Sequence, residues 1–306
     1  MNNVISTSVV VFRNLKDYKF VAKLEPEKKL EIVEKLTDIL KGKFEYINLS
    51  KVDDKTLEKL QAANIEYNSQ HLYINKDKTV AISLFVDEHL SIRSRVVGYD
   101  TSVYKTVTSL IKLLNDKVNL AYSDEYGYLM SDISRVGPGM HITSEVCLPN
   151  LKNINKIEQV MNNLMKLRYK LTAVDGDTFL LQTTCNLGFS ESEVIADFEK
   201  MLKKLCDLEV ESAKMIHAER PDELIDQVSR CIAILSSAHL MSPRELRGHI
   251  STLRTAKNLE LSKISTTDID RLQALTSCRN EEFVSRDDLI KIASKTKEIM
   301  KGVQDV

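Results

Sequence analysis

A glycine–proline–glycine turn is the feature of this chain best suited to phosphate chemistry. Gly137 and Gly139 flank Pro138, and a glycine-rich turn can point backbone N–H groups at a phosphate. The proline removes one of those donors, however, and two glycines are equally typical of an ordinary tight turn. His89 and His141 lie on either side of the turn in sequence, outside any HxH or HExxH pattern. Packing or hydrogen bonding is therefore a better interpretation for them than a metal or acid–base site.

Three polar residues alternate along the segment after His89. Ser91, Arg93 and Arg95 are two residues apart, so on a β-strand all three point to the same face. Two guanidinium groups on one face suit an anionic ligand. A solvated strand face is the more common reason for such a pattern.

The longer stretch from Tyr128 to Leu151 resembles the signature of the guanidino kinases, and most closely that of the bacterial protein arginine kinases, the McsB branch. The positions that match this signature are Tyr128, Leu129, Ser131, Gly137, Gly139, Leu148 and Pro149. The resemblance continues in order along nearly the whole chain, through the segments Val4 to Phe20, Phe85 to Arg93, Leu187 to Glu191 and Ser229 to Arg254.

This resemblance implies an α+β fold in two parts. Residues 1–218 are expected to form a guanidino-kinase-like catalytic domain, a large and mainly antiparallel sheet flanked by helices. Residues 219–306 are expected to form an α-helical C-terminal domain that resembles the phosphoarginine-binding domain of the McsB branch.

The positions that the resemblance assigns to nucleotide binding keep at most one fixed cation and one titratable imidazole. The family neutralises the phosphates with arginines, and their positions here hold Ser8, Val10, Ser91, His141 and Lys170. Serine and valine carry no charge and cannot replace the bidentate guanidinium fork. Phosphoryl transfer depends on such cations, so the pattern argues against catalysis.

The positions of the other catalytic groups are altered as well. Asp132 stands where the family has a cysteine, and Asp87 stands where it has a catalytic glutamate. The loop that carries a second glutamate is expected to be shortened to Thr172–Gly176, with only Asp175 as a stand-in. A shortened loop would not close easily over a substrate.

The phosphoarginine pocket of the McsB branch is also expected to be degenerate. In the matching segment, Glu282 and Phe283 replace an arginine and an aspartate, while Arg286 matches a later arginine. A glutamate in place of a cation repels a phosphoryl group.

Composition limits the classes of function. The 306 residues are 43% hydrophobic and 28% charged, with a net charge of -1, so no overall field attracts nucleic acid or an anionic membrane. The five cysteines form no CxxC pair, which favours reduced thiols over a disulfide framework or a zinc site. With no apolar run of eighteen residues and no secretory leader, we expect a cytoplasmic protein without a membrane segment.

Hydrophobic periodicity and turn residues predict the elements that position these residues. Glu27–Leu40 is expected to form a helix with Leu30, Val33, Leu36, Ile39 and Leu40 on one face. The other predicted elements of the first part are a hairpin of residues 71–75 and 79–86, a strand at 91–97, and helices at 102–114, 154–167 and 190–208.

The second part is predicted to be a bundle of about four helices. Its helices are expected to begin at Pro221, after Ser242 as N-cap, after Thr266 or Thr267, and after Ser285. No low-complexity linker separates the two parts, so we expect them to pack against each other.

Two hypotheses of function follow. The first is a pseudokinase that binds no cofactor and works as a regulatory or scaffolding subunit of an arginine-phosphorylation and Clp quality-control system. Its partner would be an active arginine kinase paralogue, an McsA-type activator or a ClpC-type unfoldase, in a homo- or hetero-oligomer. The second is an active protein arginine kinase that uses ATP and Mg²⁺ in a rearranged site built from Arg93, Arg95, Lys170 and Asp87. A cleft that takes another small ligand is a third possibility.

Overall fold

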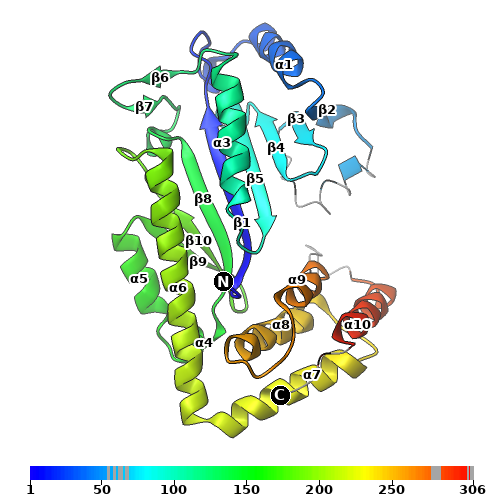
Figure 1. Cartoon of the computed structure of the whole chain (residues 1–306). Helices are drawn as coiled ribbons and strands as arrows, with labels where there is room; N and C mark the ends of the chain where they lie inside the picture. Colours follow the sequence, from blue (N-terminus) through cyan, green and yellow to red (C-terminus); the bar gives the residue numbers. More distant parts are fainter. Residues whose placement is uncertain are drawn as a thin grey trace.

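An eight-stranded antiparallel sheet forms the centre of the molecule (Figure 1). The computed structural model describes residues 1–53, 56–57, 60, 65, 69–276, 284–301 and 303. The strand order is β2-β3-β4-β5-β1-β8-β10-β9. The strands are β1 Val4–Arg13, β2 Phe44–Asn48, β3 His71–Asn75, β4 Val80–Leu84, β5 Leu90–Val97, β8 Met140–Cys147, β9 Tyr169–Asp175 and β10 Thr178–Thr183. The fold is α+β, as expected.

Helices cover one side of this sheet and share a single apolar core with it. Helix α3 packs on β1 and β5, α6 on β8 and α5 on β9, and α3 and α6 lie side by side in front of the strands in Figure 1. The helices are α1 Pro26–Leu40, α3 Ser102–Asn115, α4 Pro149–Asn153, α5 Ile157–Lys166 and α6 Glu191–Glu219. A small hairpin of β6 (Tyr122–Ser123) and β7 (Gly127–Tyr128) adjoins them.

The other side of the sheet carries most of the polar residues of its strands. In β5, Leu90 and Ile92 are buried, while Ser91, Arg93 and Arg95 are only half-buried. This alternation follows from the two-residue period of a strand. The expectation that these three polar residues share a face is confirmed, and that side is called the open face below.

Helix α6 connects the sheet to the helical part of the chain. Ser190 caps it, since its hydroxyl accepts from the Glu193 N–H and the Glu193 carboxylate accepts from the Ser190 N–H. This is the predicted capping box. The helix runs on to Glu219, well past the predicted end at residue 208, and Pro221 begins the next helix.

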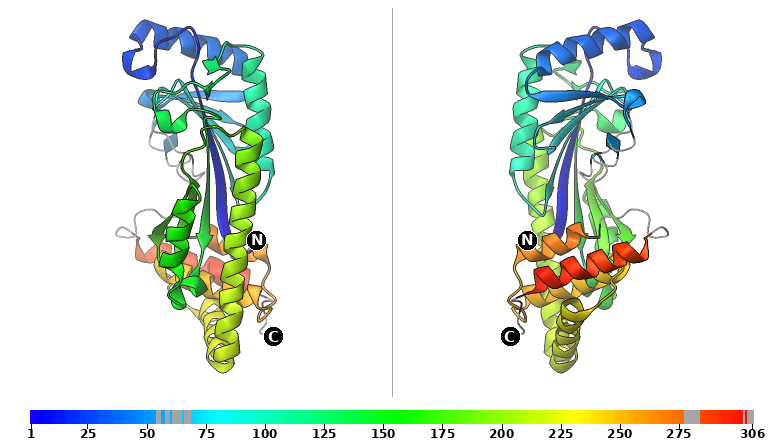
Figure 2. Two further views of the ribbon diagram at one scale, coloured as in Figure 1. Left: turned by 90° about the vertical axis from the view of Figure 1, so that its left-hand side faces the viewer. Right: turned by 90° about the vertical axis from the view of Figure 1, so that its right-hand side faces the viewer.

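Four further helices enclose a second apolar core at one end of the sheet (Figures 1 and 2). They are α7 Pro221–Ser237, α8 Pro243–Asn258, α9 Thr266–Ala274 and α10 Arg286–Met300. The Ser242 and Ser285 hydroxyls accept from the third helical N–H of α8 and α10, as predicted. Ser265, and not Thr266 or Thr267, is the N-cap of α9.

Three predictions about local structure are wrong. Residues 172–175 belong to strand β9, so the loop expected at Thr172–Gly176 does not exist and only a tight turn remains. Leu30 is exposed, because the buried face of α1 is formed by Ile32, Val33, Leu36 and Leu40. The helix expected from residue 154 begins at Ile157, because the short α4 ends first and Asn155 has a φ of 57°.

Candidate functional site

A row of polar side chains crosses five strands on the open face. Ser8 of β1 pairs with Arg95 on one side and with Thr143 on the other. Thr143 of β8 in turn pairs with Gln182 of β10, and Gln182 pairs with Lys170 of β9. Directly paired residues point to the same side of a sheet. The sheet therefore brings Ser8 and Lys170, 162 residues apart in sequence, onto one surface together with Arg95.

The remaining positions of the predicted nucleotide site lie in the adjoining rows. Val10 pairs with Arg93 and with His141, and Phe12 pairs with Ser91. All five positions singled out in the sequence thus share the open face. Val10 itself is buried in an apolar cluster with Phe12 and Met130, so the floor at this point is hydrophobic.

Arg95 is held along the sheet by its neighbours. Its Nη2 atom lies 3.1 Å from the Ser6 hydroxyl and 3.2 Å from Glu145 Oε2. The guanidinium is therefore already paired with a carboxylate on β8.

Arg135 is a cation of this face that sequence reasoning missed. Its Nη1 atom lies 3.0 Å from Asp87 Oδ2, and its Nε atom lies 3.8 Å from Asp132 Oδ2. Its guanidinium also stacks on the ring of Phe12, 4.5 Å from the centroid. Both acids at predicted catalytic positions therefore face one arginine. The spacing of Asp132 and Arg135, three residues apart, was the only signal in the sequence.

His141, one of the positions predicted from the sequence to bind nucleotide, is buried in a way that disfavours a positive charge. Burial lowers the pKa of its imidazole below the usual value, and the nearby Arg135 acts in the same direction. The ring is therefore neutral at pH 7. It packs edge-on against Phe12, with the ring centroids 6.0 Å apart.

His89 has a structural position. It is fully buried, its Nδ1 atom accepts from the Leu15 N–H at 3.0 Å, and its Nε2 atom lies 2.8 Å from the Lys19 carbonyl oxygen. Since Nδ1 accepts, the proton must be on Nε2. Among the described residues, no group of three or more His, Cys, Asp or Glu side chains is arranged to hold a metal ion.

A buried carboxylate that the sequence did not single out fixes the loop before the glycine turn. Glu88 accepts from the Asn14 amide at 2.6 Å and from both the N–H and the hydroxyl of Ser131. The network places the segment that carries Asp132 beside Asp87.

The glycine turn binds an arginine of the chain itself. Arg13 is completely buried, donates to the carbonyl oxygens of Phe12 and Pro138 at 2.7 Å and 3.0 Å, and pairs with Glu191. Gly139 has a φ of 57°, and a Cβ there would lie 2.9 Å from the Phe12 carbonyl oxygen. The turn presents a carbonyl group to a cation here, so it is built as a structural turn and not as a phosphate cradle.

Two predicted site regions do not join this surface. Asp175 lies at the far end of β9, five residues or about 17 Å from Lys170 along the strand. It pairs there with Arg247 of α8 at 2.8 Å. Of the predicted phosphoarginine positions, Glu282 and Phe283 lie outside the described residues, and Arg286 is exposed at the first position of α10.

No described helix is long and apolar enough to cross a membrane.

Comparison with known proteins identifies the family of this sheet. The family model for the C-terminal catalytic domain of ATP:guanido phosphotransferases matches residues 11–212. The chain belongs to this family. The matched segment contains all of the open face except the start of β1.

Relatives named protein-arginine kinase match the chain beyond that domain. One from an Exiguobacterium species is 26% identical, over 84% of this chain and 78% of the relative. One from Clostridium acetobutylicum is 23% identical, over 96% of this chain and 95% of the relative. The chain is thus an McsB-like member of the guanidino kinase family.

Solved structures of other members share the fold. Lombricine kinase aligns with a TM-score of 0.62 at 18% identity, over 68% of this chain and 66% of that chain. The duplicated taurocyamine kinase from Schistosoma mansoni with bound transition state analogue components aligns with a TM-score of 0.63 at 18% identity, over 80% of this chain and 38% of that chain.

Proposed function

We propose that this chain is a pseudokinase of the protein-arginine-kinase group that acts as a regulatory or scaffolding subunit in an arginine-phosphorylation and Clp quality-control system. It would bind no nucleotide cofactor. Its partner would be an active arginine kinase paralogue, an McsA-type activator or a ClpC-type unfoldase.

The arrangement around Arg135 carries this proposal. Transition states of phosphoryl transfer require fixed cations at the phosphate oxygens and a free carboxylate at the acceptor. Here Asp87 and Asp132 both face Arg135, and that guanidinium lies over Phe12, beside the buried Val10. Val10 and His141 stand at positions where the sequence resemblance predicts phosphate-binding arginines; here the floor is apolar, and burial lowers the pKa of the His141 imidazole. A single arginine that stabilises such a transition state contributes about 10³- to 10⁵-fold to the rate of phosphoryl transfer.

Calorimetric titration with ATP and Mg²⁺ tests the loss of nucleotide binding. We expect no saturable binding up to millimolar nucleotide, and no rise in melting temperature. A dissociation constant in the micromolar range would contradict the proposal. The Val10→Arg variant should be titrated in parallel. It places a cation beside His141, and this cation should increase the affinity for ATP only if the rest of the nucleotide site is intact.

Recovery of a partner from native cells tests the scaffolding role. We expect co-purification of an arginine kinase, its activator or a ClpC-type unfoldase, unaffected by Asp87→Ala or His141→Ala. Charge reversal at Arg247 or Arg254 would not be a clean probe, because these side chains bind Asp175 and the Asn2 carbonyl oxygen within the chain.

Exposed cations of the helical part are better probes of a partner surface. The side chains of Arg230 and Lys291 are 76% and 71% exposed, so Arg230→Glu and Lys291→Glu should alter association without unfolding the protein. Recovery of none of these partners, with a solution mass of a monomer or plain homodimer, would leave the scaffolding role unsupported.

An active kinase with a rearranged site is the second candidate. It is favoured by one observation, that Arg93, Arg95 and Lys170 share the open face on paired strands. Mass spectrometry of a protein substrate after incubation with ATP and Mg²⁺ separates the two proposals. Phosphoarginine formed by the purified chain, and lost in Arg93→Ala, would establish the enzyme.

A further inference from the structure

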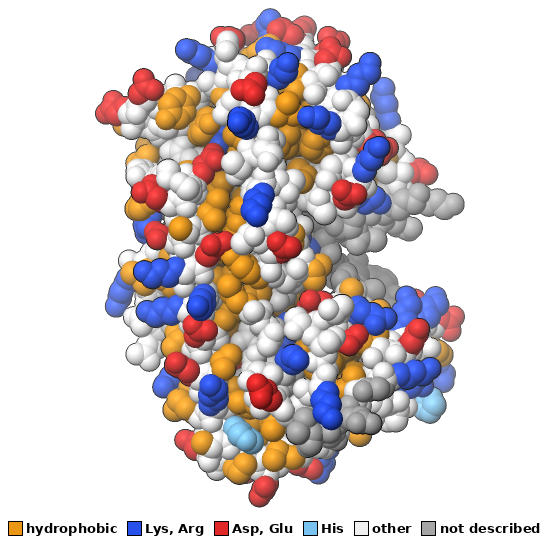
Figure 3. All heavy atoms as spheres, in the orientation of Figure 1, with side chains coloured by type: hydrophobic (Ala, Val, Ile, Leu, Met, Phe, Trp, Pro, Cys, Tyr) orange, Lys and Arg blue, Asp and Glu red, His pale blue; other side chains and the backbone are white. Residues whose placement is uncertain are grey.

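The two apolar cores of the protein are separate from each other. Among the described residues, none belongs to both. Along the chain, the sheet core ends with Leu208 of α6, and the helical core begins with Val228 of α7. Residues 209–227 therefore form an arm that belongs to neither core. On this arm Met215 and Ile225 are 48% and 45% exposed, and Figure 3 shows hydrophobic side chains on the surface at the lower end of the molecule, where the arm lies.

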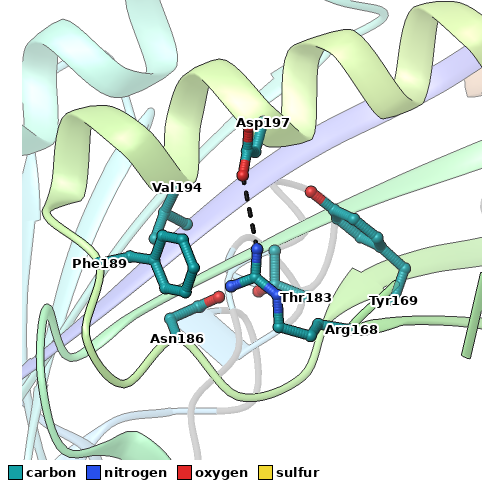
Figure 4. A pocket seen from close by; sticks show the side chains of 7 residues that line it. All are labelled: Arg168, Tyr169, Thr183, Asn186, Phe189, Val194 and Asp197. Carbon is teal, nitrogen blue, oxygen red and sulfur yellow. Dashed lines mark hydrogen bonds and ion pairs between the residues drawn. The ribbon is translucent and has the colours of Figure 1, made fainter. Parts of the chain in front are cut away.

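The first half of α6, by contrast, is fixed to the sheet. Val194 and Phe198 are buried in the sheet core. Arg168, directly before β9, lies over the ring of Phe189 at 3.8 Å from the centroid and pairs with Asp197 of α6 at 3.5 Å. Figure 4 shows this guanidinium between the two side chains. The arm begins where contacts of this kind end.

A single residue separates the two helices of the arm. Arg220 is the C-cap of α6 and the N-cap of α7, with a φ of -140° and a ψ of 64°. Pro221 has no N–H group, so the hydrogen-bond ladder of α6 cannot continue into α7. Hinges in proteins are a few residues at the ends of elements that absorb changes in φ and ψ. Arg220 has the position of such a hinge.

Polar side chains of α8 join the helical part to the sheet and to α4. Arg247 pairs with Asp175 at 2.8 Å, and at the other end of α8 the Asn258 amide donates to the Asn3 side-chain oxygen at 2.6 Å. Between them, Ser251 donates to Asp177, Thr255 accepts from Asn150, and Arg254 donates to the Asn2 carbonyl oxygen. On separation, water replaces such partners, so each bond contributes little to the net free energy. Parts of a chain that meet through polar contacts are expected to move relative to each other.

Cys147 lies beneath this joint. It is the last residue of β8, is only 4% exposed and belongs to neither apolar core. Its Sγ atom lies 3.4 Å from the Ser251 hydroxyl of α8. Two other cysteines are buried inside the cores, Cys206 in the sheet core and Cys231 in the helical core. Separation at the joint would expose Cys147 and leave these two covered.

We propose that the helical part separates from the sheet as a folded unit, turning about Arg220 while both apolar cores stay intact. The movement breaks the contacts of α8 and uncovers the end of β8 at Cys147. This device goes beyond the proposed function and does not depend on it, because it rests only on how the two parts pack.

Cysteine labelling of the full chain tests the separation. The protein is treated with N-ethylmaleimide, mass spectrometry of its peptides follows each cysteine with time, and each rate is divided by the rate in the denatured protein. Cys185 is exposed and serves as the freely reactive reference. We expect Cys147 to react at least about tenfold faster than Cys206 and Cys231, because a buried group is reached through the opening that costs least. If Cys147 reacted no faster than these two, only unfolding of the whole protein would expose it, and the proposal would be overturned.

Substitutions at the two ends of α8 test whether the joint controls this exposure. Arg247→Met and Asn258→Ala remove contacts that are about 16 Å apart along the helix, and each should accelerate the labelling of Cys147 at least about fivefold. The matched controls are Arg244→Met and Thr252→Ala, because Arg244 is exposed and the Thr252 hydroxyl donates within α8 to the Gly248 carbonyl oxygen. Neither control should change the rate. Unchanged labelling of Cys147 in both joint variants, or equal acceleration of all three buried cysteines, would contradict the separation of a folded unit.

Discussion

Arg135 lies over Phe12 on the open face and pairs with two carboxylates there. The guanidinium faces both Asp87 and Asp132. Without this cation, the two carboxylates would repel each other. The sequence placed both acids at family positions, but it gave no sign that one arginine would meet both. The ion pair between Arg135 and Asp87 forms because Glu88 holds the segment of Ser131 in place. This depends on the tertiary structure, which spacing along the chain does not reveal.

His89 should make the stability of the protein depend on pH. Burial lowers the pKa of this imidazole below its usual value, and protonation of Nδ1 would break the hydrogen bond from the Leu15 N–H. The unfolded chain then binds the proton more readily, so the free energy of unfolding falls as the pH drops below about 6.5, the pKa of an unperturbed histidine. The loss continues until the pH reaches the lower pKa of the folded state.

Chemical denaturation between pH 7.5 and pH 5 measures this effect. The pKa values of His71, His141 and His249 are also lowered by burial, so the comparison must be made with a variant. We expect His89→Gln to be less stable at pH 7.5 but to lose less stability than the natural protein on acidification. Parallel pH profiles for the two proteins would show that His89 is not a source of the dependence.

At the scale of elements, local signals predicted most helix starts correctly, but not those of α5 and α9, and they predicted the segment near residue 172 poorly. Ser190 and Ser285 form capping boxes because hydroxyl and carboxylate groups reach backbone N–H groups three residues away. Residues 172–175 were expected to form a loop because the family has one there. They form a strand because they pair with β10, with a register shift near Thr178. Pairing between strands depends on both partners, so one segment alone could not reveal it.

Helix α4 is held in place by a carboxylate from another helix. Glu209 of α6 is completely buried and accepts from the N–H groups of Asn150 and Leu151, at 2.8 Å and 2.9 Å, and from the Asn150 side-chain amide at 2.7 Å. These N–H groups lie at the start of α4, where no preceding turn can satisfy them. The carboxylate therefore serves as a cap supplied by a distant segment.

Replacement of Glu209 by leucine should destabilise the protein strongly. Three buried donors would lose their acceptor, and we expect a loss of about 3 kcal/mol in the free energy of unfolding. Glu211→Leu is the matched control, because this glutamate is exposed two residues further along α6, and its change should stay within about 0.5 kcal/mol. Similar melting temperatures for both variants would show that the Glu209 hydrogen bonds contribute little.

At the scale of the whole molecule, α8 joins the helical part to the sheet through a polar face. Its side chains at positions 247, 251, 254, 255 and 258 lie on one side of the helix. Their partners are Asp175, Asp177, the Asn2 carbonyl oxygen, Asn150 and Asn3. Each comes from an end of the sheet or from α4. Periodicity predicted the helix, but which of its faces would be buried against the sheet could not be predicted, because the buried face is polar.

Of the side chains on this face of α8, we expect Arg254 to contribute most to holding the helical part against the sheet. It is only 1% exposed, donates to the Asn2 carbonyl oxygen and lies 3.4 Å from Asp270. Arg254→Met would leave both acceptors without this cation, and we expect a loss of about 3 kcal/mol in stability. Hydrogen exchange should also accelerate at the first residues of β1, because the N-terminal segment would lose its anchor on α8.

Arg230→Met is the control: that arginine is exposed and pairs with Asp226 four residues away on α7, so its replacement should cost less than about 1 kcal/mol. If the exchange of β1 were unchanged in Arg254→Met, the contacts of Asn258 with Asn2 and Asn3 would have to hold the N-terminus by themselves.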